Sequence, residues 1–128
     1  MNDTQLHHRL REYILAAAEH QRLDREHRAN WRYKHIQEEI RIQRRQALHN
    51  TERAYTTLLN TITDLDEPTH LSRTARDLLQ KWDNYRRNHA IMVAEYNRPN
   101  QQHTAESRNT FETTLRQTAE HLKTITTK

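Results

Sequence analysis

The sequence predicts an all-α protein, built as a long antiparallel helical hairpin or coiled coil whose return arm is broken near Pro99. Three observations predict this fold. The 128 residues include no glycine, which disfavours sheet-rich folds with many tight turns. Apolar residues make up only 33% of the chain, enough for a narrow seam between helices but not for a thick globular core. They also recur at spacings of three and four residues, as on one face of a helix.

The first predicted element is a helix over residues 4–64. This stretch contains neither glycine nor proline, so no strong helix breaker interrupts it, and such a length is typical of a coiled coil. Its second half carries an apolar seam that includes Ile36, Ile40, Leu58 and Ile62. Polar residues interrupt the seam over 19–30.

A loop is predicted over 65–70, because Pro68 disfavours helical conformation in the residue before it. Thr69 or Ser72 is suited to cap the helix that follows. This second helix is predicted over 71–97, and its seam has the most regular heptad spacing in the chain. The seam consists of Leu71, Ala75, Leu78, Trp82, Tyr85, His89, Met92 and Tyr96.

A break is predicted at 98–100, around Pro99, followed by a third helix over 101–126. This helix is rich in threonine, which lowers its intrinsic helix propensity. Its seam includes Phe111, Leu115 and Leu122.

The favoured arrangement is a single domain over 1–128, in which the chain folds back at the Pro68 loop. Ile62 then faces Leu71, and Ile40 faces Val93. The alternative folds the third helix back to form a three-helix bundle. Either arrangement buries little apolar surface, so we expect a homodimer or a protein partner to cover the seam.

Several classes of function are disfavoured by composition. The absence of cysteine excludes disulfides and thiol nucleophiles, and the absence of glycine excludes phosphate-binding loops and dinucleotide fingerprints. We find no catalytic constellation, and expect neither enzymatic activity, nor a cofactor, nor a small-molecule substrate. No apolar run is long enough to span a membrane, and the N-terminus does not resemble a signal peptide. The sequence therefore predicts a cytoplasmic protein without membrane contact.

A basic stretch surrounds two aromatic residues and is the main candidate site. Residues 20–45 hold eight basic and four acidic side chains, which matches the net charge of +4 of the whole chain. Arginines interleaved with aromatic rings suit either a protein interface or a phosphate backbone with stacked bases. The candidate partner-binding or phosphate-binding residues are Arg25, Arg28, Trp31, Arg32, Tyr33, Lys34, Arg41, Arg44 and Arg45.

A second pattern places three potential metal ligands on one helix face, at His20, Asp24 and His27. His103 and Glu106 could complete such a site from the opposite arm. The alternatives are a solvated stretch in a chain with ten histidines, or buried polar groups that fix the register or admit a partner. We assign no metal site on this pattern.

These observations favour a non-catalytic protein that takes part in protein–protein interaction or assembly through packing of its helix faces. The alternative is a nucleic-acid-associated helical subunit that contacts phosphates through the arginine-rich stretch 22–45. A third hypothesis is a metal-binding helical bundle.

Overall fold

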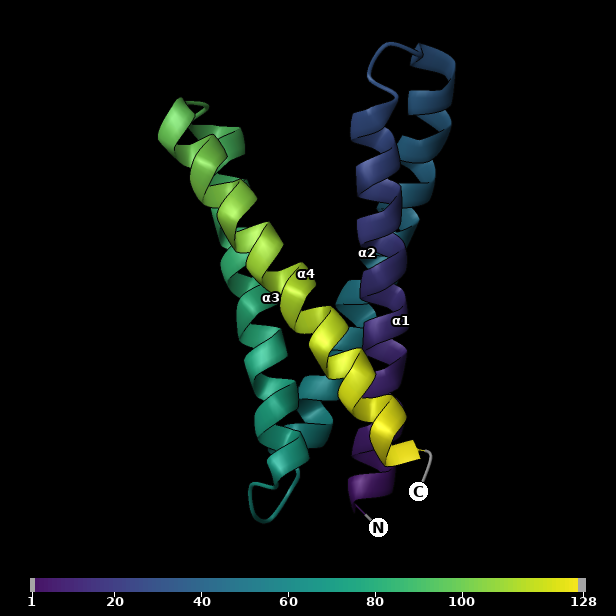
Figure 1. Ribbon diagram of the computed structural model, residues 1–128, viewed down its shortest axis with the longest axis vertical. Coiled ribbons are helices and arrows are strands. Elements are labelled where there is room, and N and C mark those ends of the chain that lie inside the picture. The colour runs from purple at the N-terminus through teal and green to yellow at the C-terminus, as the bar shows by residue number, and fades with distance from the viewer. Residues whose placement is uncertain (1, 127–128) are drawn as a thin grey trace. The chain divides into compact units, whose positions relative to one another are not determined.

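The computed structural model describes residues 2–126, and every regular element in that range is an α-helix. Four helices follow one another: α1 (Asn2–Ala29), α2 (Lys34–Thr63), α3 (His70–Ala94) and α4 (Arg98–Thr126). The prediction of an all-α protein is therefore confirmed for this range. The chain divides after Leu65 into two compact units. Helices α1 and α2 pack side by side as unit 1, and α3 and α4 do so as unit 2 (Figure 1).

In unit 1 the apolar stripe of α1 packs against that of α2. The ring of Tyr13 lies 6.4 Å from that of Tyr55, and Asp24, 11 residues later on α1, pairs with Arg44, 11 residues earlier on α2. This constant register shows a regular antiparallel hairpin. The buried apolar residues of the unit are Leu6, Leu10, Tyr13, Ile14, Ala17, Leu23, Ile40, Ala47, Leu58 and Ile62.

Unit 2 is a second antiparallel hairpin with an aromatic core. The ring of Phe111 on α4 lies 5.2 Å from that of Trp82 and 6.3 Å from that of Tyr85. All three side chains are buried, as are Leu71, Ala75 and Leu78. The predicted heptad seam is thus confirmed from Leu71 to Tyr85. Its last position, Tyr96, is 74% exposed, because α3 ends at Ala94.

The single helix predicted over 4–64 is wrong, because the chain turns at residues 30–33. The Asn30 side chain donates a hydrogen bond to the Glu26 carbonyl oxygen at 2.7 Å, and the Tyr33 amide donates to the Asn30 carbonyl oxygen at 3.0 Å. Asparagine competes with the helical backbone in this way and ends helices without glycine or proline. The hairpin partner of α1 is therefore α2, and Ile40 is buried in unit 1 while Val93 is 68% exposed.

The break predicted at 98–100 lies at 95–97 instead, and Pro99 belongs to the first turn of α4. Proline is tolerated there, because the amide it lacks would have no partner within the helix. The Asn97 side chain accepts a hydrogen bond from the Asn100 amide at 2.9 Å and so caps the helix.

The loop between the units spans 64–69 rather than 65–70. Thr69 and Ser72 together form a capping box at the start of α3, with reciprocal hydrogen bonds of 3.0 and 2.8 Å. Both of the capping residues expected from the sequence are therefore in use.

Candidate functional site

The connection between α1 and α2 presents two aromatic side chains to solvent. Trp31 is 64% exposed and Tyr33 is 60% exposed. The exposure of both rings follows from the turn, because Trp31 lies outside either helix and Tyr33 is the extended residue that precedes α2. The Arg32 guanidinium lies 4.8 Å from the centroid of the Trp31 ring, within the range of a cation–π contact.

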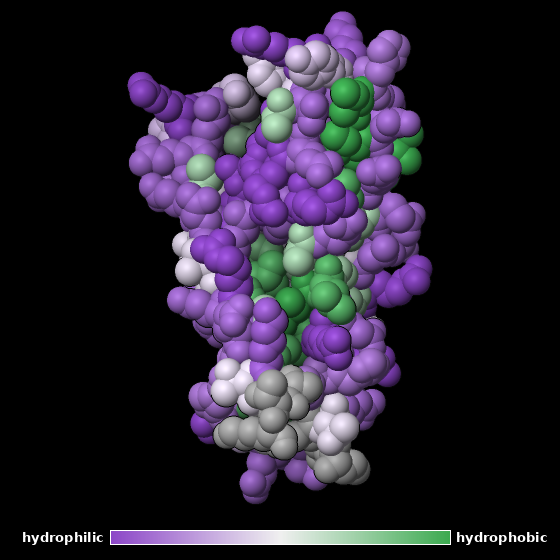
Figure 2. All heavy atoms as spheres, turned by 45° about the vertical axis from the view of Figure 1, so that its right-hand side comes forward, coloured by the Kyte–Doolittle hydropathy of each residue, from purple (hydrophilic) through white to green (hydrophobic). Residues whose placement is uncertain are grey.

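Apolar exposure continues from this connection into α2. Ile36 and Ile42 are both exposed, although the sequence placed Ile36 in the buried seam. Figure 2 shows a surface that is hydrophilic over most of its area, with hydrophobic residues exposed in only a few places. We call residues Trp31, Arg32, Tyr33, Lys34 and Ile36 the Trp31 surface. It combines exposed rings, one aliphatic side chain and two cations, a composition typical of interface hot spots.

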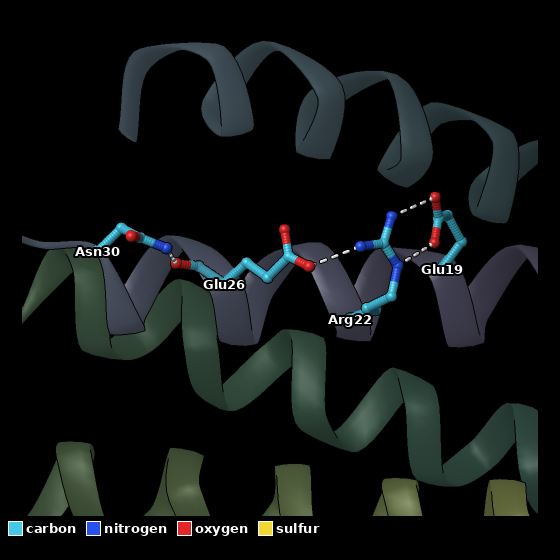
Figure 3. A network of polar contacts seen from close by, with 4 residues as sticks. All are labelled: Glu19, Arg22, Glu26 and Asn30. Carbon is cyan, nitrogen blue, oxygen red and sulfur yellow. Dashed lines mark hydrogen bonds and ion pairs between the residues drawn. The ribbon is translucent and has the colours of Figure 1, made fainter. Parts of the chain in front are cut away.

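Many arginines near this surface are held by carboxylates of their own helix. Arg22 lies between Glu19 and Glu26 on α1, with contacts of 2.6 to 2.8 Å (Figure 3). The hydrogen bond from Arg22 holds the pKa of Glu19 below its usual value. On α2, Arg41 pairs with Glu38 at 2.7 Å. These pairs reduce the positive charge that the basic stretch offers to a partner.

A polar cluster close to the connection joins α1 to α2. The Asp24 side chain is only 13% exposed; Arg44 contacts it at 3.0 Å and Arg28 at 3.4 Å. Arg44 also donates a hydrogen bond to His27 Nδ1 at 3.3 Å. Burial, and then the positive charge of Arg44, lower the pKa of His27. The cluster therefore favours the neutral form of His27, and the ion pair between Asp24 and Arg44 links the two helices.

The remaining candidate cations differ from these. Among residues 2–126, Arg32, Lys34 and Arg45 form no ion pair, and all three are exposed. Arg25 is exposed as well. Of the basic residues expected to bind a partner, Arg32 and Lys34 thus combine proximity to the exposed rings with a charge that no carboxylate of the described chain neutralises.

The five candidate metal ligands are not assembled into one site. His20 is buried with its Nδ1 3.1 Å from Gln21 Oε1, and Asp24 is taken up by the two arginines. His103 and Glu106 are exposed on α4, in the other unit. Within the part of the chain that the structure describes, no group of three or more His, Cys, Asp or Glu side chains has the arrangement of a metal site.

A groove of about 530 Å³ runs between α3 and α4 in unit 2. Two histidines line it, His70 and His121, with ring centroids 5.6 Å apart. Asp77 lines the groove too, but it forms an ion pair with Lys81 at 3.2 Å. Sequence reasoning did not single out this groove, because His70 and His121 become neighbours only when α4 folds back on α3.

Comparison with protein-family models, with curated proteins and with solved structures found no match. Over residues 2–126, none of the helices combines the length and the apolar character that crossing a membrane requires.

The chain has a second group of exposed hydrophobic residues, which, unlike Trp31 and Tyr33, was not predicted from the sequence. Ile91, Val93 and Tyr96 are exposed around the connection between α3 and α4. The heptad spacing placed Tyr96 in the seam, but the spacing alone does not show that the helix ends before it. Asn97, which caps α4, is the residue that could have indicated this end.

Proposed function

We propose that the chain is a non-catalytic protein–protein interaction protein that binds its partner through the Trp31 surface. The observation that carries the proposal is the exposure of both Trp31 and Tyr33 at one short helix connection. Covering such large exposed rings with a partner removes apolar surface from water and therefore stabilises the complex. The cytoplasmic location expected from the sequence is part of the same proposal.

The ion pairs favour a protein partner over a nucleic acid. A phosphate backbone attracts many cations at once, and its affinity scales with the number of phosphates neutralised. Arg28, Arg41 and Arg44 are each engaged by a carboxylate of this chain. A surface with few available cations and exposed aromatic rings suits a protein partner better than a nucleic acid.

Photo-crosslinking from the surface tests this proposal in the cells that make the protein. A photoreactive phenylalanine analogue replaces Trp31 or Tyr33, and Leu15 serves as the matched control, because it is 62% exposed but lies in the middle of α1. We expect a discrete protein adduct from positions 31 and 33 that is absent from position 15. Equal adducts from all three positions, or none from the connection, would contradict the proposal.

Nucleic-acid binding remains the second candidate, favoured by Arg32, Lys34 and Arg45, which form no ion pair within residues 2–126 and belong to the same basic stretch as the exposed rings. Fluorescence anisotropy with a labelled single strand tests it. If the alternative holds, affinity falls steeply between about 50 and 200 mM salt. A strand that does not bind, or whose binding is independent of salt, rules the alternative out.

A further inference from the structure

The connection between α2 and α3 carries the opposite charge to the Trp31 surface. Asp64, Asp66 and Glu67 are exposed, and within residues 2–126 none of them forms an ion pair. Leu65, between Asp64 and Asp66, is half-buried, and Pro68, which follows Glu67, is exposed. We call residues 64–68 the acidic connection. It combines three available carboxylates with two apolar side chains.

These two surfaces lie at opposite ends of one helix. Lys34 begins α2, and Asp64 follows its last residue, Thr63. The 30 residues of α2 separate them by about 45 Å at 1.5 Å per residue. This distance exceeds the reach of any side chain, so the Trp31 surface cannot meet the acidic connection of its own copy.

We propose that the partner of the Trp31 surface is the acidic connection of a second copy of this chain. The inference rests on the proposed function and names its partner. Two copies whose α2 helices run antiparallel bring both pairs of complementary surfaces together at once. Such an arrangement is a closed two-fold dimer, the commonest symmetry among protein oligomers.

The chemistry of the two surfaces matches in both of its components. Arg32 and Lys34 supply cations to the three carboxylates, and charge complementarity of this kind sets both orientation and register. Trp31 and Tyr33 supply rings that pack on Leu65 and Pro68. Each surface therefore offers what the other lacks.

Paired charge-reversal variants of the full chain test this arrangement. One variant carries Arg32→Glu and Lys34→Glu, and the other carries Asp66→Lys and Glu67→Lys. Glutamate at the first position of α2 interacts favourably with the helix dipole, so the first variant is expected to fold, which circular dichroism checks. The control carries Arg76→Glu and Arg116→Glu, two exposed arginines of unit 2 without an ion pair in the described chain.

Light scattering over a dilution series gives the mass of each protein in solution. We expect the wild type and the control to have about twice the chain mass of 15.6 kDa. Each reversal variant should dissociate at a concentration at least about tenfold higher, because like charges then face each other. An equimolar mixture of the two variants should recover the dimer, because the exchanged charges are complementary again.

A wild type that stays monomeric, or a mixture of variants that stays dissociated, would overturn the inference. So would a dimer that neither variant weakens. These outcomes are distinct from a failure of the proposed function. A monomer that still yields a discrete foreign adduct from position 31 keeps the interaction surface and rejects only the second copy as its partner.

Discussion

The Asp24 cluster provides the sharpest test of how unit 1 is held together. Asp24→Asn replaces the carboxylate with an amide of the same size, so packing is retained while the charge is lost. Arg44 from α2 and Arg28 from α1 then face each other without the anion that separates them. The variant therefore removes an ion pair between the two helices and leaves two neighbouring cations.

The magnitude follows from the burial of the three side chains. Hydrogen bonds to charged groups contribute about 1.5–3 kcal/mol, whereas exposed ion pairs contribute about 0–1 kcal/mol. The Asp24 side chain is 13% exposed, but Arg44 and Arg28 are 30% and 40% exposed. The pair lies between these limits, so we expect the free energy of unfolding to fall by about 1.5 kcal/mol. The melting temperature then falls by roughly 5 to 10 °C.

Urea and thermal unfolding at neutral pH, followed by circular dichroism, measure the effect. Asp77→Asn is the matched control, because its partner Lys81 lies at a similar distance, 3.2 Å, but both side chains are more exposed. The control should change stability by less than about 0.5 kcal/mol. If Asp24→Asn changes it no more than the control does, the ion pair between α1 and α2 does not stabilise unit 1, and the reasoning is wrong.

Three further predictions concern pH, the core and a helix cap. The pKa of His27 is lowered in the folded chain by burial and by Arg44. The contribution of this shift to the free energy of unfolding is fully present above about pH 6.5, the ordinary pKa, and is lost as the pH falls towards the lowered pKa. The free energy of unfolding of His27→Gln, measured against pH, should lack this component. Trp82→Ala should cost about 3–5 kcal/mol, because Trp82 is 4% exposed, whereas Trp31→Ala should leave the urea midpoint nearly unchanged at concentrations at which the chain is monomeric. Thr69→Ala removes the capping box and should cost about 1 kcal/mol in the same assay, while an unchanged midpoint would show that the cap is dispensable.

Much of the secondary structure could be predicted because its causes are local. The spacing of Leu71, Leu78 and Tyr85 identifies the buried face of α3, and all three side chains are buried. Thr69 and Ser72 cap the same helix through groups that lie within one turn of each other. The prediction that Trp31 and Tyr33 belong to a candidate interaction surface also came from sequence, although their exposure had to be seen in the structure.

The remaining features depend on which apolar stripe covers which. A spacing of three and four shows which face of a helix is buried, but it carries no information about the stripe that packs against it. Asn30 permits a turn at the cost of a few helical hydrogen bonds, and the burial of Tyr13 and Leu58 between α1 and α2 outweighs that cost. By itself, then, the sequence determined an all-helical chain, its buried faces and its basic aromatic segment. Only the tertiary structure decided that the chain turns at this segment and forms two hairpins, because pairing between helices is a non-local property.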